Sequence, residues 1–171
     1  EYVGIVDYLV TLKSKYYVKK ISNLFDLSQQ KLSVLEIGCG DGTMLKEFKK
    51  LGWSTQGNER SVAIDEENSL NISDKPLQSF NDNQFDLVLM YNSLEHIDNP
   101  NSIINLSLKK LKKNGFFICT VPNYLSWQYK FGKNNWFHLD IPRHRNIFSI
   151  DSFKELSNQN EFQLNFKSST I

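Results

Sequence analysis

The sequence of 171 residues contains little arginine and no long apolar run. Only three of its 20 basic residues are arginines, and 19 acidic residues leave a formal net charge of +1. Proteins that hold nucleic acid through phosphate contacts need a basic surface, so this balance excludes a dedicated nucleic-acid binder. No apolar run approaches the ~20 residues of a membrane-spanning helix, so we expect no membrane partner.

Cysteine is scarce as well. The chain has only Cys39 and Cys119, both in apolar, strand-like surroundings, and no signal peptide is recognisable. Two lone cysteines in a chain of this length more often stay reduced than pair, although a disulfide in a secreted domain is the alternative. We therefore expect a cytoplasmic protein. A content of 40% hydrophobic and 23% charged residues is typical of a folded, soluble chain.

Predicted strands and helices alternate along the chain. Short apolar runs that end at glycine, proline or polar residues predict strands at 33–37, 54–58, 70–72, 85–91, 116–121 and 162–171. Helical spacing of apolar residues predicts helices at 5–27, 42–51, 61–68, 101–113, 126–131 and 150–158. Apolar strands separated by helices indicate an α/β fold with a parallel sheet covered on both faces. Ligands of such sheets bind at the carboxyl ends of the strands, here after residues 37, 58, 91 and 121.

The first predicted strand runs into a glycine-rich turn, Glu36-Ile37-Gly38-Cys39-Gly40-Asp41-Gly42-Thr43. Alternate glycines allow a tight strand-to-helix turn and a close backbone approach to a ligand, and the following helix presents free N–H groups. A nicotinamide-binding fingerprint would place its third glycine at position 43, where this chain has Thr43. A turn that only needs flexible residues is the alternative interpretation.

An acid follows at the end of the second predicted strand. Glu59 lies 21 residues after Gly38, where a carboxylate can accept hydrogen bonds from both hydroxyls of a ribose. The alternative is a solvated acid at a helix start. The glycine turn and the acid at this spacing together favour a nucleoside-containing ligand.

Four segments together resemble the class I S-adenosylmethionine-dependent methyltransferases: LEIGCGDGT, the acid Glu59, FDLVLMYNSLEHIDNP and LKKNGFFICTVPN. The resemblance covers about residues 30–165 and is strongest to the small-molecule branch with ubiquinone-biosynthesis and polysaccharide-cluster enzymes. It implies a doubly wound, Rossmann-like sheet in the order 3-2-1-4-5-7-6 with an antiparallel last strand. No sequence follows 162–171 for that strand, so we expect a domain that lacks it.

The resemblance also implies a set of cofactor-binding residues. The turn residues would line the methionine end of S-adenosylmethionine, and Glu59 would hold the ribose. Asp74, with Lys75 beside it, would meet the adenine amino group, with Gln78 as a substitute. Tyr91 and Asn92 would close the pocket, unless they only pack at the strand end. The complete set is Glu36, Gly38, Cys39, Gly40, Asp41, Glu59, Arg60, Asp74, Lys75, Tyr91 and Asn92.

The candidates for acceptor chemistry lie in two segments. Methyl transfer needs a base only for a protonated acceptor, and His96 after the fourth strand suits that role, unless it and Glu95 only brace the loop. The segment HLDIPRHRNIFS (138–149) resembles the D-x-P-R-H-x-x-x-F-S stretch near the acceptor site of the same branch. Its arginines suit an anionic group, although a structural contact between Arg143 and Asp140 is the alternative. We select three catalytic candidates: His96, Arg143 and His144.

No metal site is expected. A set of His138, Asp140 and His144 is conceivable, but it lacks a regular ligand spacing. Aromatic residues are dense between the fifth strand and this segment, where they form either a lid over a flat or sugar-like acceptor or ordinary packing. These residues are Tyr124, Trp127, Tyr129, Phe131, Trp136 and Phe137, and the N-terminal helix adds Tyr16 and Tyr17.

The function that we expect from these observations is S-adenosylmethionine-dependent methylation of oxygen or nitrogen in a small molecule, which leaves S-adenosylhomocysteine. The acceptor would be anionic, sugar-linked or aromatic, and the oligomeric state stays open. We expect one domain over 1–171: a helical cover (1–30), a cofactor-binding core (31–121), an acceptor-side lid (122–149) and a last helix and strand (150–171). The alternatives are an NAD-dependent oxidoreductase and a non-catalytic binding module.

Overall fold

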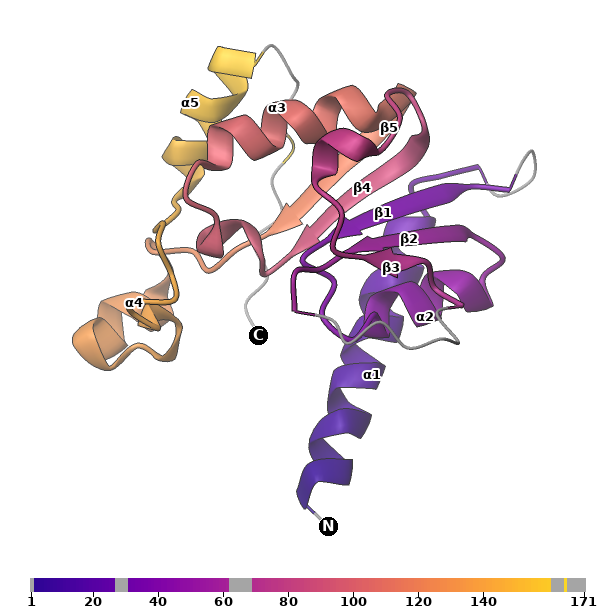
Figure 1. Ribbon diagram of the computed structural model, residues 1–171. Coiled ribbons are helices and arrows are strands. Elements are labelled where there is room, and N and C mark those ends of the chain that lie inside the picture. The colour runs from indigo at the N-terminus through magenta and orange to yellow at the C-terminus, as the bar shows by residue number, and fades with distance from the viewer. Residues whose placement is uncertain (1, 27–30, 62–68, 161–164, 166–171) are drawn as a thin grey trace. The chain divides into compact units, whose positions relative to one another are not determined.

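The computed structural model describes residues 2–26, 31–61, 69–160 and 165 (Figure 1). The chain divides into two compact units. The first unit comprises Glu1–Tyr91 and Leu106–Ile118, and the second comprises Asn92–Asn105 and Cys119–Ile171. The single domain expected over 1–171 stays a prediction.

A five-stranded sheet, almost all of it in the first unit, is the main feature of the fold. Its order is β3 (Ile72–Ser73), β2 (Ser54–Asn58), β1 (Ser33–Ile37), β4 (Phe85–Tyr91) and β5 (Leu111–Thr120). β1 runs parallel to both β2 and β4, and β2 runs parallel to β3. The predicted α/β class and the part 3-2-1-4-5 of the predicted order are therefore confirmed.

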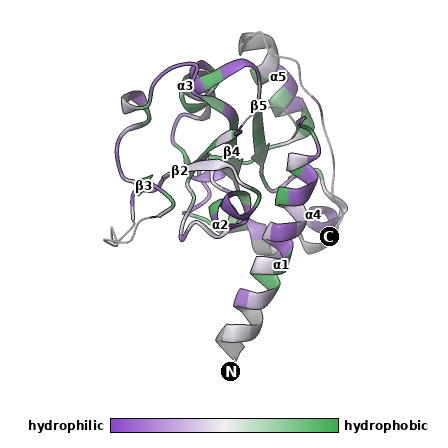
Figure 2. Cartoon of the chain, turned by 90° about the vertical axis from the view of Figure 1, so that its right-hand side faces the viewer, coloured by the Kyte–Doolittle hydropathy of each residue, from purple (hydrophilic) through white to green (hydrophobic). Residues whose placement is uncertain are grey.

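Two helices cover the first unit. α2 (Thr43–Lys50) packs on β1 and β2, and α1 (Tyr2–Ser22) packs on α2 with its C-terminal half, while its first turns project away from the sheet (Figure 1). Met44, Leu45 and Phe48 of α2 are buried together with Glu47, which pairs with Lys50, and hydrophilic and hydrophobic residues alternate around this helix (Figure 2). Each fully buried side chain of this size contributes about 1.5–3 kcal/mol, so α2 is held by its apolar face.

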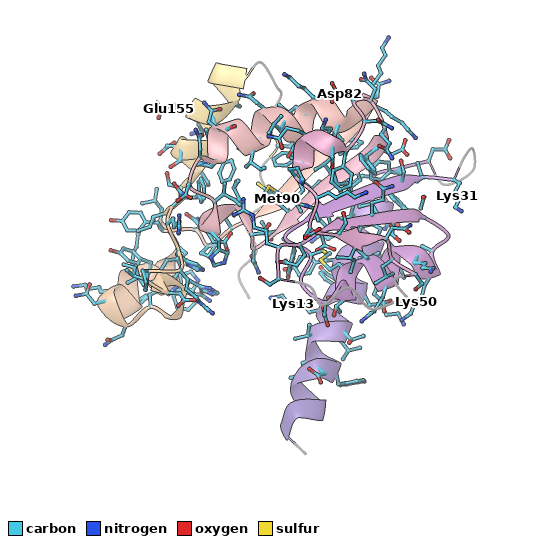
Figure 3. All side chains as sticks on the ribbon, viewed as in Figure 1. Lys13, Lys31, Lys50, Asp82, Met90 and Glu155 are labelled. Atoms are coloured by element: carbon cyan, nitrogen blue, oxygen red, sulfur yellow. The ribbon has the colours of Figure 1, made fainter. Side chains whose placement is uncertain are left out.

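The apolar core of the first unit explains why these short strands form. Val34, Leu87 and Leu89 are completely buried in adjacent strands of the sheet. Met90, labelled in Figure 3, is also completely buried in β4. Such strands, buried on both faces, read as continuous apolar runs, which is the pattern that predicted them.

Several element boundaries were predicted wrongly: the helix expected at 5–27 spans Tyr2–Ser22, and the strand expected at 70–72 spans Ile72–Ser73. The expected helix at 101–113 ends earlier: α3 spans Pro100–Lys110, and β5 begins at Leu111 rather than at residue 116. Lys112 then pairs with Asp86 of β4 at 2.7 Å. Lysines are good helix formers, so the sequence favoured a longer helix, but this ion pair and the sheet draw the segment into an extended conformation.

The remaining elements are short. α4 (Trp127–Gly132) and α5 (Ile150–Asn160) agree with the predicted helices, and Ser149 caps α5 through its hydroxyl, which accepts from the Ser152 N–H at 3.2 Å. Single 3-10 turns lie at Leu77–Ser79, Leu94–His96, Lys133–Asn135 and Phe137–Leu139. The predicted helix at 61–68 and strand at 162–171 lie, apart from residues 61 and 165, outside the described residues. None of the helices in the described part has the length and apolar content needed to cross a membrane.

Candidate cofactor and acceptor sites

The turn between β1 and α2 depends on glycine. Gly38, Gly40 and Gly42 have φ angles of 72°, 53° and 72°, in the left-handed region that other residues rarely adopt. At Gly42 a Cβ would also lie 2.8 Å from the Cδ1 atoms of Ile72 and Leu70. The glycines predicted from the sequence are therefore required by the backbone itself.

Glu59 lies directly beside this turn. One carboxylate oxygen, Oε2, accepts a hydrogen bond from the Gly40 N–H at 3.0 Å, and the other, Oε1, accepts from the Ser61 N–H at 3.2 Å. The pairing of β1 with β2 explains this position, because Ile37 lies opposite Asn58 and both strands end at the same edge. The structure thus brings together the glycine turn and the acid, which the sequence separates by about twenty residues.

Glu36 at the end of β1 is a buried carboxyl group with an unsatisfied oxygen. Its side chain is 3% exposed, and Oε2 has no hydrogen-bond partner. Burial, with a smaller effect of the Asp41 charge, raises the pKa of Glu36 to about 8. A buried polar atom without a partner is costly, so this carboxyl group is suited to a ligand that donates to it.

Asp41 has the opposite character. Its carboxylate accepts from the Thr43 N–H at 3.0 Å and from the Thr43 hydroxyl at 2.7 Å, across the start of α2. Partial burial alone would raise the pKa of Asp41, but the two hydrogen bonds from Thr43 and the nearby Lys46 outweigh it, and the pKa lies below its ordinary value. Asp41 therefore stays ionised at neutral pH beside the uncharged Glu36.

The Cys39 side chain points into the core. Its thiol is buried, and a Cβ added at Gly57 would lie 2.7 Å from its sulfur. Burial, followed by the charges of Glu36 and Glu59, raises the pKa of Cys39 to about 12, so the thiol is not reactive. Only its backbone can face a ligand. Gly57 was missed by the sequence analysis, although a glycine within a strand is itself a sign of close approach.

The two residues assigned to the adenine amino group, Asp74 and Lys75, are exposed. The Lys75 carbonyl accepts from Asn58 Nδ2 at 2.6 Å, so Asn58, which the sequence analysis missed, ties this turn to the end of β2. Lys75 lines a cavity of about 440 Å³, whereas Asp74 is not among the lining residues. Arg60 is exposed as well.

Tyr91 at the end of β4 is covered by α1. Its ring centroid lies 5.6 Å from that of Tyr17, and Lys13 Nζ lies 6.0 Å from the ring centre. Burial, followed by Tyr17 and Glu36, raises the pKa of Tyr91 to about 12. Of the two tyrosines expected from α1, Tyr17 thus packs on the site, while Tyr16 is 60% exposed.

Asn92 opens the second unit. Its N–H donates to the Thr120 carbonyl at 3.0 Å, and its side-chain oxygen accepts from the Thr120 hydroxyl at 3.2 Å. These bonds resemble the strand-end packing that was the alternative to a binding role.

His96 and His144 meet in the second unit. Their ring centroids are 4.7 Å apart. Glu95 lies beside them, and one ring nitrogen of each histidine and one carboxylate oxygen of Glu95 all lie within 4.8 Å of one another. Glu95 is 2% exposed, and its Oε2 has no hydrogen-bond partner. Burial raises the pKa of Glu95, and the two histidines partly oppose that rise. Glu95 entered the sequence analysis only as a possible brace.

The arginines of the segment 138–149 are exposed and paired. Arg143 Nε donates to the Asp140 carboxylate at 2.8 Å, and Arg145 forms an ion pair with Asp98. The Arg143 side chain is 75% exposed. The contact between Arg143 and Asp140 is the one that the structural alternative required, and it leaves the other guanidinium edge open to solvent.

The aromatic segment has a packed part and an exposed part. Trp136 is buried and stacks edge-on against Tyr129, which in turn contacts Tyr124. Trp127 and Phe131 contact each other but are 54% and 82% exposed. The residues around Trp136, Leu139 and Asp140 line a hollow of about 450 Å³. Both interpretations of this segment, packing and lid, therefore describe part of it.

Comparison with known proteins agrees with the fold. The chain is 30% identical over 131 residues to a mitochondrial ubiquinone biosynthesis O-methyltransferase of Dictyostelium discoideum, with 63% of this chain and 41% of that protein covered. It is 25% identical over 144 residues to a ubiquinone biosynthesis O-methyltransferase of Rickettsia akari, covering 75% and 55%. The chain thus spans about half the length of these relatives.

A solved structure of a SAM-dependent methyltransferase from Archaeoglobus fulgidus superposes with a TM-score of 0.68 at 22% identity, covering 91% of this chain and 69% of that one. This likeness shows the Rossmann-like methyltransferase fold. Nothing in the comparisons supports the NAD-dependent alternative. A family model described as "Methyltransferase domain" matches residues 11–165. The chain therefore belongs to the methyltransferase domain family.

Proposed function

We propose that this protein transfers a methyl group from S-adenosylmethionine to an oxygen atom of a small molecule and leaves S-adenosylhomocysteine. The observation that carries the proposal is the hydrogen bond from the Gly40 N–H to Glu59, which sets a ribose-binding acid against the glycine turn. The names of the relatives, O-methyltransferases of ubiquinone biosynthesis, favour oxygen over nitrogen as the accepting atom.

The first unit suits this cofactor at its methionine end. S-Adenosylmethionine brings an activated methyl group on a sulfonium, together with an ammonium and a carboxylate. The buried Glu36 Oε2 lacks a donor, which an ammonium group would supply. The backbone N–H groups at the start of α2 can donate to the carboxylate. Gly38, Cys39 and Gly40 would contribute backbone only, because a side chain at either glycine would be strained.

The roles proposed for the remaining cofactor candidates follow from their places at the strand ends. Glu59 holds the ribose, with Arg60 at the rim. Lys75, tied to Asn58, lies on the adenine side, and the exposed Asp74 beside it is the candidate for the adenine amino group. Tyr91, with its high pKa, stays uncharged and packs as an apolar wall. Asn92 follows it at the boundary of the second unit.

The second unit suits the acceptor. Positioning supplies much of the rate of an in-line methyl transfer, and a hydroxyl acceptor must also lose its proton. His96 and His144 are the candidates for taking that proton, because histidine is the side chain that most often serves as a general base. The open edge of Arg143 suits an anionic substituent. The hollow beside Trp136 suits an aromatic or sugar-linked body, since such surfaces stack on indole rings.

Titration calorimetry tests the proposal. S-Adenosylmethionine and S-adenosylhomocysteine are expected to bind the purified chain, and Glu59→Ala is expected to weaken both by about tenfold or more, as lost charge-assisted hydrogen bonds do. Asp151→Ala, which removes an exposed carboxylate from α5, is the matched control and should bind as the wild type does. Binding of NAD without S-adenosylmethionine would support the oxidoreductase instead. Unchanged affinity in Glu59→Ala would support a non-catalytic module.

We further propose a reducing compartment, the cytoplasm, as the place where the protein works. Cys39 and Cys119 are both free thiols, and unpaired cysteines are more common in proteins of a reducing compartment. Non-reducing mass spectrometry of protein from its native source tests this, and a disulfide would contradict it.

A further inference from the structure

Three side chains of the second unit converge in the arrangement of a metal site. Glu95 and His96 come from the 3-10 turn Leu94–His96, and His144 comes from the segment before α5. One nitrogen or carboxylate oxygen from each lies within 4.8 Å of one from each of the others. Two imidazoles and one carboxylate are a ligand set that binds Zn²⁺ and other divalent transition metals with positions left open.

The backbone orients both imidazoles for this role. His96 Nδ1 lies 2.9 Å from the Arg143 carbonyl oxygen, and His144 Nδ1 lies 2.8 Å from the His138 carbonyl oxygen. A carbonyl only accepts, so each Nδ1 must carry the hydrogen, and each Nε2 then presents a lone pair. Ligating histidines commonly donate their other ring N–H to a carbonyl in this way, which fixes both the tautomer and the ring direction.

The carboxylate has the complementary property. Glu95 is 98% removed from solvent, as its 2% exposure shows, and its Oε2 has no hydrogen-bond partner. An ionised carboxylate in such a place needs a cation or a donor. Its own backbone is held firmly, because the Glu95 carbonyl accepts from the N–H groups of Arg145 at 2.8 Å and Asn146 at 3.1 Å. Backbone hydrogen bonds therefore hold both the glutamate and the two histidines in place, and the three side chains together suit a cation between them.

We propose that Glu95, His96 and His144 bind one divalent transition-metal ion of the Zn²⁺ class. Ligand atoms around one tetrahedral Zn²⁺ lie about 3.4 Å apart, so the three side chains would move inward by about 1 Å on binding. At least one coordination position would stay open for water or an acceptor hydroxyl. This set differs from the one considered from the sequence: Asp140 is engaged by Arg143, and the exposed His138 ring stacks on Trp136. The expectation of no metal site is thus opposed by this proposal.

The metal would also take part in the proposed methyl transfer by activating the acceptor, and this part of the inference alone rests on the proposed function. An acceptor hydroxyl bound at the open position would lose its proton to bulk water near neutral pH, since a divalent metal lowers the pKa of a hydroxyl group bound to it. The acceptor oxygen would then be activated by the metal rather than by the His96 imidazole acting as a base.

The test measures metal binding directly. The purified chain is stripped with a chelator, dialysed and titrated with Zn²⁺ by calorimetry in the absence of S-adenosylmethionine. One equivalent is expected to bind, and His144→Ala and Glu95→Gln should each weaken binding by about tenfold or more. His138→Ala keeps the backbone carbonyl that His144 uses and should bind as tightly as the wild type. Cys119→Ser, which removes a thiol that interacts electrostatically with Glu95, should also bind unchanged.

A second readout needs no variant, because substitution of the buried Glu95 can disturb folding. Co²⁺ titrated into the stripped wild-type chain is expected to give the visible absorption bands of a low-symmetry, four- or five-coordinate site. Absence of binding by Zn²⁺ and of Co²⁺ bands, or binding that His138→Ala or Cys119→Ser abolishes while His144→Ala leaves it intact, would overturn the proposal. Cofactor binding is measured separately with Glu59→Ala, so failure of the metal site and failure of the proposed function are distinguishable.

Discussion

Each unit has a buried glutamate with an unpartnered oxygen, Glu36 within the end of β1 and Glu95 four residues after β4, and the two differ in what surrounds them. Glu36 lies beside three glycines and the anionic Asp41, and Glu95 lies between two histidines. Both carboxyl groups are almost wholly buried, and each has one oxygen without a partner. Burial, with a smaller effect of the Asp41 charge, raises the pKa of Glu36 to about 8, whereas at Glu95 the two histidines partly oppose the rise that burial causes.

A glutamate side chain that is equally buried in both units therefore suits a different ligand in each. In the first unit the surroundings are backbone, held open by positive φ angles, which suits an organic group with its own ammonium. In the second unit the surroundings are imidazoles oriented by carbonyl oxygens, which suits a metal ion or a proton. As proposed, the first ligand would approach a backbone frame, and the second would complete a cluster of side chains.

The largest effect is expected from the glycine frame. Gly42→Ala combines a left-handed φ of 72° with a Cβ 2.8 Å from Leu70 and Ile72, so it should lower the free energy of unfolding by about 2–4 kcal/mol. Gly40→Ala, where φ is 53° but no atom lies within 4 Å of the added Cβ, should cost only about 1–2 kcal/mol. Chemical denaturation measures both. Equal costs would mean that Ile72 and Leu70 move aside freely.

The next effect concerns the glutamates themselves. Glu36→Gln should weaken S-adenosylmethionine binding by about 2 kcal/mol, because it removes a charge-assisted hydrogen bond. Glu95→Gln should leave that affinity unchanged and instead weaken Zn²⁺ binding. Calorimetry with each ligand on each variant gives a two-by-two comparison. A loss of cofactor affinity in both variants would show that the two carboxyl groups do not have separate ligands.

The pH dependence sharpens the contrast further. Below pH 8 the Glu36 carboxyl group is mostly protonated, and an ammonium ligand prefers its ionised form. Affinity for S-adenosylmethionine should therefore rise by up to about tenfold per pH unit as the pH approaches 8, and level off above it. Calorimetry in buffers of different ionisation enthalpy should detect proton release on binding. A flat profile that matches Glu36→Gln would contradict this.

The same raised pKa acts on stability with a definite sign. Between the unfolded pKa of 4.5 and the folded value of about 8, the folded state binds more protons than the unfolded state. Stability without ligand should therefore decline as the pH rises through this window, and Glu36→Gln should make the decline shallower.

The smallest effect is expected from Arg143→Ala. The Arg143–Asp140 pair is exposed, so its loss should leave the melting temperature unchanged within error. A clear drop in melting temperature would instead support the structural role that the sequence left open. Tyr91→Phe, which removes only a hydroxyl at the end of β4, is a useful comparison in the first unit.

Much of the first unit could be predicted from the sequence because its signals are local. An apolar run followed by alternating glycines is a strand and a strained turn wherever it occurs, and Gly38, Gly40 and Gly42 all have the expected positive φ. Gly57 and Asn58 escaped notice because their role depends on a partner strand: one makes room for Cys39, and the other binds the Lys75 carbonyl.

The second unit was less predictable because its contacts span long separations. His96 binds the Arg143 carbonyl across 47 residues, and Asn146 Nδ2 donates to the Ile97 carbonyl at 2.5 Å across 49. Nothing in either segment alone indicates that Glu95 would be buried between histidines. The early end of α3 had the same cause, since Lys112 pairs with Asp86 of a different strand.

The sequence by itself determined the α/β class, because periodicity is a local property, and the spacing of the glycine turn and Glu59 favoured a nucleoside-containing ligand. The strand order was implied by the resemblance to a known family and not by the periodicity. Only the tertiary structure decided which polar side chains are buried away from solvent without a hydrogen-bond partner. Burial without a partner is a property of the packed chain, and it singled out Glu36 and Glu95 among the acidic residues. The tertiary structure also shows what two of the few arginines do. Arg143 and Arg145 form ion pairs with aspartates, in the segment whose backbone orients the two histidines.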